Sequence, residues 1–414
     1  MKKRTGIIGG GAAGLFAACL FKKYSGNEDI DVTVLEKNQV PGIKLTLTGH
    51  GRCNITNMKP VSELRKGYHE ADNFIYPALK EFGPEDTVAL FENELGLKTV
   101  EEDNNRIFPE CGSAVKVRDS IVSYVSDSVK MICDSKVLDI KKTSVFEVRT
   151  SKGTFCFDDL ILSCGGRSFP QTGSAGDSYR LAESLGHTVV PVRAALAPVK
   201  AGDVSSGLTS ALSGVTVNAK ASVYCNERKT ASCIGDLLFA EFGLTGPAIM
   251  ELSREIPADT ATQGIAIELD LIHSMSDEQF DAELQGLISE HPDSKISSLL
   301  ARYMPVSVAA EVCSAAGAAG LYAQNFTKEN RRRIISKAKH LRIEIEQAPS
   351  IDKAYVTRGG VSLKEIDRKT CRSRLVEGLY IIGEALDIDG ISGGYNLQAC
   401  MSEAYLAVKD ILGK

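Results

Sequence analysis

A glycine-rich turn near the start of the chain constrains its fold more than any other feature. The residues Gly9-Gly10-Gly11-Ala12-Ala13-Gly14 follow the apolar run Gly6-Ile7-Ile8 and precede an apolar stretch from Leu15 to Phe21. This order predicts a buried strand, a tight turn and a helix. Gly9 permits the turn, Gly11 admits a close ligand, and Gly14 lets the helix pack on the strand. The pattern therefore predicts a dinucleotide pyrophosphate at the N-terminus of the helix.

An acidic residue after the next predicted strand completes the motif. Glu36 follows the β-rich run Asp31-Val32-Thr33-Val34-Leu35, at the roughly 20-residue spacing that such sites require. A carboxylate there can accept hydrogen bonds from both hydroxyls of an adenosine ribose, and it disfavours a 2′-phosphate. The strand, helix and strand form a βαβ unit, which is typical of an α/β dinucleotide-binding domain.

The same N-terminal segment has some features of a secretory leader, since Lys2-Lys3-Arg4 precedes an uncharged run from Thr5 to Leu20. We favour the dinucleotide site, because cleavage of a leader would delete the glycine turn. The run is also shorter than the roughly 20 apolar residues that cross a bilayer. We therefore expect no association with a membrane.

Composition limits the remaining classes of protein. A chain of 414 residues is long for one core and indicates two or three domains. The 11 cysteines include no C-x-x-C pair and the six histidines no metal-binding spacing, so we expect reduced thiols, a cytoplasmic protein and no metal site. A net charge of −5 gives no general attraction to nucleic acid, which we therefore do not expect as a partner. The sequence does not indicate an oligomeric state.

The period of the apolar residues changes along the chain. Short antiparallel strands are predicted between Lys136 and Phe157, followed by a buried strand from Leu160 to Leu162. A period of two, clearest from Val215 to Tyr224, predicts a half-buried strand of a β domain that starts near residue 190. A capping box formed by Ser276 and Gln279 opens a helical stretch. Alternation returns from Leu341 to Ile345, which indicates that the chain re-enters the β domain.

A second strand-to-helix turn lies near the end of the chain. The apolar run Gly378 to Gly383 leads through Asp387 to Gly393-Gly394-Tyr395-Asn396, and a helix follows. N–H groups at the start of that helix can bind a phosphate or polarise a flavin carbonyl, and Asp387 can accept a hydrogen bond from a polyol. An ordinary strand-helix connection rich in glycine gives the same pattern, so this segment alone leaves both interpretations open.

Seven motifs, distributed in order over nearly the whole chain, resemble a bacterial flavoprotein family. They are Gly9-Gly10-Gly11-Ala12-Ala13-Gly14, Gly42-Ile43-Lys44-Leu45, Thr48-Gly49-His50-Gly51-Arg52-Cys53-Asn54, Leu162-Ser163-Cys164-Gly165-Gly166, Gly235-Asp236-Leu237-Leu238-Phe239, Gly243-Leu244-Thr245-Gly246-Pro247, and Gly383-Glu384-Ala385-Leu386-Asp387 with Gly393-Gly394-Tyr395-Asn396-Leu397-Gln398. The family is the HI0933-like, or BaiN-like, NAD(P)/FAD-dependent oxidoreductases, also called aminoacetone-oxidase-like flavoproteins. The resemblance implies an α/β fold with a split Rossmann-like FAD-binding domain and an inserted β-barrel domain that carries a helical insertion. We expect these three parts to span residues 1–190 with 350–414, 191–270 with 340–349, and 271–339.

The resemblance also assigns residues to the cofactor. It implies that Gly9 to Gly14 hold the pyrophosphate, that Glu36 binds the adenosine ribose, and that the strand at Val137 passes the adenine. The other residues that we expect along FAD are Lys37, Lys44, Leu45, Gly51, Arg52, Cys53, Asn54, Gly165, Gly166, Gly383, Glu384, Asp387, Gly394, Asn396 and Leu397. His50 and Cys164 depart from the residues that are usual at their positions, which leaves the local loop geometry around His50 open.

The implied activity is hydride transfer through the flavin. No second G-x-G-x-x-G follows a strand, so we expect NAD(P)H to visit the substrate side of the flavin rather than a domain of its own. The leading hypothesis is reduction of a conjugated ketone of steroid or bile-acid type, with His50 as the candidate proton donor. A purely structural loop role for His50 competes with this. Cys53 is interpreted as a small buried residue rather than a redox thiol.

Two other functions stay open at this point. One is a flavin amine oxidase that passes electrons to O₂. The other is a nucleic-acid-modifying flavoprotein, prompted by the basic run Arg331-Arg332-Arg333. We favour a solvated helix face as the explanation of this run, because the whole chain is acidic and no aromatic residues are interleaved with the charges.

Overall fold

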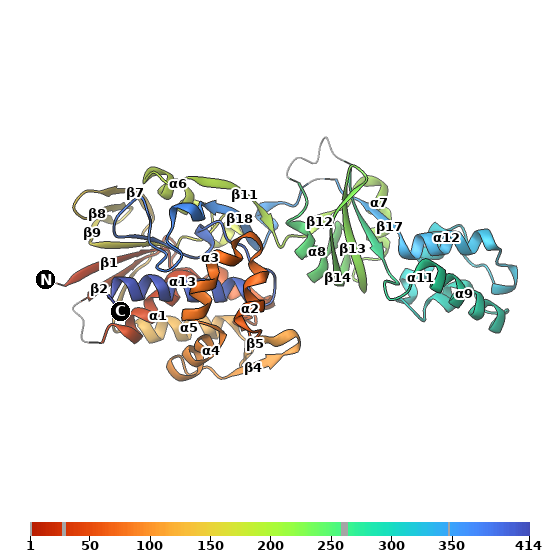
Figure 1. Ribbon diagram of the computed structural model, residues 1–414, viewed down its shortest axis with the longest axis horizontal. Helices are drawn as coiled ribbons and strands as arrows, with labels where there is room; N and C mark the ends of the chain where they lie inside the picture. Colours follow the sequence, from red (N-terminus) through yellow and green to blue (C-terminus); the bar gives the residue numbers. More distant parts are fainter. Residues whose placement is uncertain (1, 27–29, 258–263, 347) are drawn as a thin grey trace. The chain divides into compact units, whose positions relative to one another are not determined.

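The computed structural model describes residues 2–26, 30–257, 264–346 and 348–414 and divides the chain into two compact units (Figure 1). One unit comprises Met1–Arg193 and Tyr355–Lys414, and the other comprises Ala194–Ala354. Each unit has its own hydrophobic core. The further division of the inserted part at residue 271 stays a prediction.

A five-stranded parallel sheet forms the centre of the first unit. Its order is β19 (Leu379–Ile381), β10 (Asp159–Leu162), β1 (Lys3–Ile8), β2 (Ile30–Leu35) and β6 (Val129–Ile132). The strands are short apolar runs because helices and loops cover both faces. The α/β class with a Rossmann-like parallel sheet is therefore confirmed, and the C-terminal segment supplies the edge strand β19.

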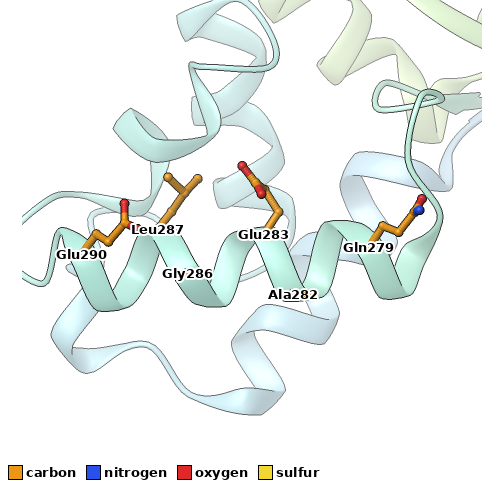
Figure 2. Close-up of a pocket in the computed structure, with 6 residues that line it drawn as sticks. All are labelled: Gln279, Ala282, Glu283, Gly286, Leu287 and Glu290. Atoms are coloured by element: carbon orange, nitrogen blue, oxygen red, sulfur yellow. The ribbon is translucent and has the colours of Figure 1, made fainter.

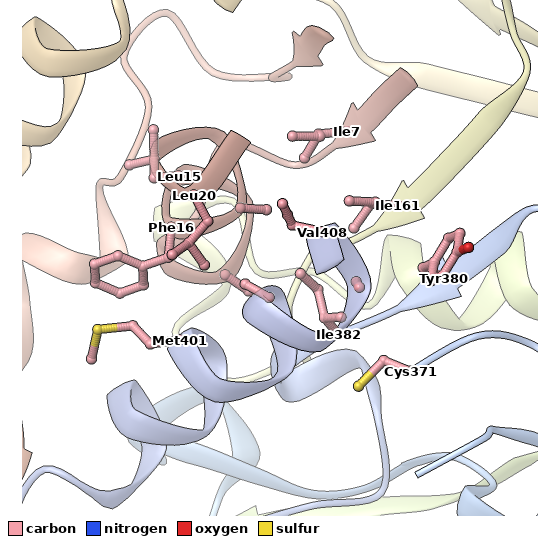
Figure 3. Close-up of a cluster of buried hydrophobic side chains, with 14 of the residues drawn as sticks. Ile7, Leu15, Phe16, Leu20, Ile161, Cys371, Tyr380, Ile382, Met401 and Val408 are labelled. Carbon is pink, nitrogen blue, oxygen red and sulfur yellow. The ribbon is translucent and has the colours of Figure 1, made fainter. Parts of the chain in front are cut away.

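Two helices pack side by side against this sheet. They are α1 (Ala12–Tyr24) and α13 (Tyr395–Ile411). Figure 3 shows Phe16 and Leu20 of α1 near Met401 and Val408 of α13 in one buried cluster. Helix α1 follows β1 closely, and α13 follows β19 after the connection of residues 382–394. The two predicted helix N-termini thus belong to the same unit.

Smaller elements surround the parallel sheet. The predicted antiparallel strands between Lys136 and Phe157 are confirmed as β7 (Val137–Lys142), β8 (Phe146–Thr150) and β9 (Gly153–Phe157). Two further sheets pair β3 (Thr56–Asn57) with β5 (Arg106–Pro109) and β4 (Thr99–Glu102), and β11 (Val189–Ala195) with β18 (Val356–Val361). The helices are α2 (Val61–Leu64), α3 (Asp72–Glu81), α4 (Pro84–Ala89), α5 (Ala114–Val125) and α6 (Asp177–Ser184).

The second unit is built on a six-stranded antiparallel sheet. Its order is β12 (Val199–Lys200), β15 (Gly243–Thr245), β14 (Arg228–Ala240), β13 (Thr216–Cys225), β16 (Ile265–Asp270) and β17 (Leu341–Glu344). The predicted barrel is corrected to a half-barrel. Among the described residues, the ends of the edge strands β12 and β17 are joined by an isolated bridge between Ala201 and Ile345 and by the adjacent ion pair of Lys200 with Glu346, not by a ladder.

Helices complete the second unit. They are α7 (Asp203–Ala211), α8 (Pro247–Ser253), α9 (Asp277–Glu290), α10 (Ile296–Leu300), α11 (Val306–Ala315) and α12 (Lys328–Lys339). The predicted capping box is confirmed: Ser276 Oγ accepts from Gln279 N, and Gln279 Oε1 accepts from Ser276 N at 2.8 Å. Lys339 ties the end of α12 to β16, because its buried ammonium donates to Asp270. Over the described residues, none of these helices has the length and apolar character that a membrane crossing requires.

Candidate cofactor site

The glycine turn between β1 and α1 has the geometry that its sequence predicts. Gly9 has a φ of +102°, and a Cβ atom there would lie 2.7 Å from the carbonyl oxygen of Ser163. A Cβ atom at Gly14 would lie only 2.0 Å from the carbonyl oxygen of Gly9. At Gly11, by contrast, a Cβ atom would meet nothing within 4 Å. The backbone thus requires glycine at two positions and leaves open space at the third.

The two helices that follow the glycine-rich turns, α1 and α13, begin without a side-chain cap. Gly11 occupies the N-cap position of α1, and Gly394 that of α13. Neither residue offers a side-chain acceptor to the first N–H groups of its helix, which include those of Ala12 and Ala13. Such N–H groups, together with the helix dipole, favour an anionic ligand.

Glu36 lies directly beside the glycine turn. Its carboxylate is buried, with Oε2 accepting from Gly10 N at 2.7 Å and Oε1 accepting from Asn38 N at 2.8 Å. Burial raises the pKa of Glu36, and these two hydrogen bonds oppose the rise. Ser135 N donates to the Glu36 carbonyl, and the Ser135 hydroxyl is buried without a hydrogen-bond partner among the described residues. Polar groups that a ribose could bind therefore gather at this point.

The segments next to Glu36 hold three more of the predicted residues. Lys37 forms an ion pair with Asp177 at the start of α6. The carbonyl of Val137 accepts from Arg180 at 3.3 Å. Gly165 has a φ of +73°, and the Ser174 hydroxyl, 3.5 Å from where its Cβ would lie, is a second buried hydroxyl to which the described residues give no partner.

A polar cluster joins four segments that are far apart in the chain. Lys44 Nζ lies 2.6 Å from Glu384 Oε2 and 2.7 Å from Ser168 Oγ. The other oxygen of Glu384 accepts from Ser168 Oγ and from Thr357 N, each at 2.7 Å. Gly166 lies against the same groups, since its Cβ would be 2.4 Å from Thr357 Oγ1. The predicted residues Lys44, Gly166 and Glu384 thus meet, through two residues that the sequence did not single out.

The loop from Thr48 to Cys53 is strained in the way that glycine favours. His50 has a φ of +56° and Cys53 a φ of +64°, with Gly51 at +83° between them. His50 and Gly51 are exposed, whereas Leu45 and Cys53 are buried. Burial raises the pKa of the Cys53 thiol to about 12, which favours the packing role over a redox role. Arg52 pairs with Glu102 and lies over the Phe108 ring, 4.3 Å from its centroid.

The glycine turn before α1 forms one wall of the site, and the C-terminal segment of residues 383–397 forms the other. In the amide orientation that satisfies its neighbours, Asn54 accepts from Gly394 N at 3.2 Å. Asn396 closes its own loop, with Nδ2 donating to the Gly390 carbonyl and Oδ1 accepting from Gly390 N, both at 2.9 Å. Leu397 is buried. Burial, and next the charge of Asp389, raise the pKa of Asp387.

The two walls meet at Gly383. A Cβ atom on this residue would lie 2.8 Å from Ala13 Cβ in the first turn of α1. Gly383 N donates to Glu403 Oε2 at 2.6 Å. Sequence reasoning missed Glu403, Ser168 and Thr357, because nothing in their local pattern separates them from ordinary helix or loop residues.

These residues fit FAD. The open space at Gly11 and the uncapped starts of α1 and α13 provide places for a pyrophosphate. The buried Glu36 and the unpartnered hydroxyls of Ser135 and Ser174 provide places for a ribose and a polar chain. His50 and Gly51 lie exposed in the loop from Thr48 to Cys53.

A surface groove in the second unit offers no comparable chemistry. It runs along one side of α9, as Figure 2 shows, and is lined by Gln279, Ala282, Glu283, Gly286, Leu287 and Glu290. Its two carboxylates would repel a pyrophosphate, and the lining contributes neither a cation nor a positive-φ glycine turn.

Comparison with known proteins identifies the family of the chain. The HI0933-like protein Rossmann domain family matches residues 3–410. The chain is 31% identical over 98% of both sequences to a 3-dehydro-bile acid delta(4,6)-reductase of Clostridium scindens. It is 29% identical, over 98% of this chain and 97% of the relative, to a ribosomal RNA dihydrouridine synthase of Escherichia coli. The solved structure of a 3-ketosteroid delta1-dehydrogenase from Sterolibacterium denitrificans shares the fold, with a TM-score of 0.52 at 12% identity and 99% coverage of both chains.

Proposed function

Since this chain belongs to the HI0933-like Rossmann-domain family of flavoprotein oxidoreductases, we propose that it reduces a carbon-carbon double bond conjugated with a carbonyl group. NAD(P)H is the proposed reductant. The observation that carries the proposal is the pair of relatives, aligned over almost their full lengths, whose names describe a bile-acid reductase and a dihydrouridine synthase.

The substrates that those names describe share one reacting group. A 3-oxo steroid with double bonds at positions 4 and 6 contains a conjugated enone. Uridine also contains a ring double bond conjugated with a carbonyl, and dihydrouridine is the product of its reduction. In either case the carbon β to the carbonyl is electron-poor and accepts a hydride, and the α-carbon then takes a proton. One flavin chemistry therefore serves both substrate classes.

The roles that we propose for the individual residues follow from the contacts of the site. When bound, FAD would supply the redox chemistry, which is hydride transfer between NAD(P)H and the substrate. Gly9 to Gly14 and the start of α1 hold the pyrophosphate, and Glu36 holds the ribose. The start of α13 favours negative charge developing nearby, because its N–H groups carry no side-chain cap. His50 is the proposed donor of the proton to the α-carbon, since its exposed loop position leaves it accessible.

The test is anaerobic stopped-flow spectroscopy on the purified holoenzyme. We expect NADH or NADPH to bleach the flavin band, and a steroid 4,6-dien-3-one or a uridine-containing RNA to restore it, while the saturated steroid or a dihydrouridine-containing RNA does not. Bleaching by a primary amine, with no response to NADH or NADPH and recovery in O₂, would instead identify an amine oxidase and refute the proposal.

Ribosomal RNA is the second candidate substrate. Relatives from Escherichia coli and Haemophilus influenzae, 29% and 28% identical, are both named ribosomal RNA dihydrouridine synthases. Net charge alone therefore does not exclude a nucleic-acid substrate, although Arg331 pairs with Asp281 and Arg333 with Glu329, which reduces the basic character of α12. Mass spectrometry of ribosomal RNA from cells with and without the gene distinguishes the two substrate classes.

A further inference from the structure

A buried glutamate lies under the wall of the cofactor site. Glu403 sits in the middle of α13 and is fully buried. Its Oε2 atom accepts from Gly383 N at 2.6 Å, and its Oε1 atom is buried with no hydrogen-bond partner among the described residues. A carboxyl group with one oxygen unpartnered in an apolar core is costly and needs an explanation.

The groups that face Glu403 cannot neutralise a negative charge. They are Tyr68 from the 65–71 segment, Cys371 from the segment before β19, and Cys400 on α13 itself, and the pKa of each is raised in part by the Glu403 charge. Figure 3 shows Cys371 and Met401 in this part of the core. Burial raises the pKa of Glu403 to about 8. At neutral pH the side chain is therefore mainly the uncharged acid.

The partner of Glu403 is the residue at which the two walls of the site meet. Gly383 adopts a φ of +69°, and its Cα faces Ala13 in the first turn of α1 so closely that a Cβ would approach within 2.8 Å. The N–H of Gly383 points the other way, into the core, where Glu403 receives it. Any shift of this hydrogen bond moves the turn relative to the start of α1.

We propose that Glu403 is a positioning residue for the cofactor site, because its carboxyl group holds the backbone N–H of Gly383 and keeps the C-terminal turn against α1. This inference rests on the proposed FAD site. Ionisation of Glu403 puts an anion in an apolar core, and the cost of removing that anion from water exceeds the gain from one charge-assisted hydrogen bond. The turn then opens to hydrate the carboxylate, and FAD binds more weakly as the pH rises past that ionisation.

The test is titration of the full-length apoprotein with FAD, followed by quenching of flavin fluorescence, between pH 6 and 9.5. The dissociation constant of the wild type should be flat up to about pH 8 and then rise by up to about tenfold per pH unit. Glu403→Gln keeps an acceptor for Gly383 N–H and cannot ionise, so its dissociation constant should lack the rise above about pH 8 that the ionisation of Glu403 causes. Glu403→Leu leaves that N–H buried without a partner and should weaken binding by roughly tenfold to a hundredfold at every pH.

Glu85→Gln is the matched control, because it makes the same substitution at a glutamate that is exposed on α4 in the same unit. This variant should follow the wild-type pH profile, including any contribution from the flavin itself. Wild-type affinity in Glu403→Leu, or a wild-type pH profile in Glu403→Gln, overturns the inference. If Glu403→Leu does not fold, the Glu403→Gln profile still decides. Failure of the wild type to bind FAD at any pH refutes the cofactor assignment itself, and this outcome is distinct from the others.

Discussion

The substitutions Gly11→Ala and Gly14→Ala should separate two requirements of the glycine turn, which are space for the ligand and close packing of helix α1. The Gly11→Ala methyl group meets no atom within 4 Å, and the backbone at this residue, with φ −77° and ψ −168°, suits any amino acid. The apoprotein should therefore keep its stability or gain about 0.5 kcal/mol from a less flexible unfolded chain. The same methyl group enters the space that the pyrophosphate needs, which should raise the FAD dissociation constant roughly tenfold to a hundredfold.

Gly14→Ala should destabilise the folded apoprotein itself, before any effect on FAD binding. Its methyl group would lie 2.0 Å from the Gly9 carbonyl oxygen, whereas ordinary contacts begin near 3.4 Å. Helix α1 must then move away from the turn by more than an ångström, and α1 is packed against α13 throughout the core. An overpacked core of this kind loses on the order of 3 kcal/mol, so the apoprotein itself should be destabilised.

Urea unfolding of the two apoproteins, followed by circular dichroism, measures the change in stability, and FAD titration measures the change in affinity. The expected pattern is a stable Gly11→Ala apoprotein that binds FAD poorly and a Gly14→Ala apoprotein that unfolds at lower urea. Equal destabilisation by both substitutions would contradict the assignment of open space to Gly11. Wild-type FAD affinity in Gly11→Ala would contradict the pyrophosphate site.

Three further predictions concern single side chains. His187 is buried against Glu365 and Ser373, and burial lowers its pKa. The free energy of unfolding should therefore be highest above the unfolded-state pKa of about 6.5 and should fall below that pH by at most about 1.4 kcal/mol per pH unit. A His187→Gln variant that loses the same stability in acid would refute this. Cys53 should resist iodoacetamide in the native protein at pH 8 while the exposed Cys111 reacts, as peptide mass spectrometry can establish. His50→Gln should slow turnover of a verified substrate at least tenfold and leave flavin reduction by NAD(P)H unchanged, and undiminished turnover would exclude His50 as the proton donor.

Local patterns in the sequence predict the elements whose partners are close in the chain. The turn at Gly9 to Gly14, the strand that leads to Glu36 and the capping box at Ser276 each depend on neighbouring residues, and each is where the pattern puts it. Strand β6 was not predicted, because Val129-Lys130-Met131-Ile132 is short and gains its identity only by pairing with β2. The barrel was overestimated for a related reason, since its closure depends on the length of the edge strands and not on their alternation.

The cofactor site divides in the same way between local and distant contacts. Glu36 reaches Gly10 within one βαβ unit, so the spacing between the glycine turn and the end of the next strand predicts the position of Glu36. Lys44 reaches Glu384 across most of the chain, and no periodicity connects them. Only the family resemblance brought both residues into the prediction, and it did not indicate that they form an ion pair.

Helix α13 shows why the positioning contacts were beyond a single sequence. Its apolar residues Leu397, Met401, Ala404 and Val408 indicate one face of the helix, and that pattern does not place Gln398, Ser402 or Glu403. In the structure these three side chains are fully buried. Gln398 Oε1 accepts from Thr56 and Thr87, and Ser402 Oγ donates to the Phe82 carbonyl. Leaving any one of these buried groups unpaired costs about 1–3 kcal/mol, so a slip of α13 by one residue would break them all. The helix is therefore held in register by polar contacts, and that register sets where its N-terminus and Gly394 lie in the proposed cofactor site.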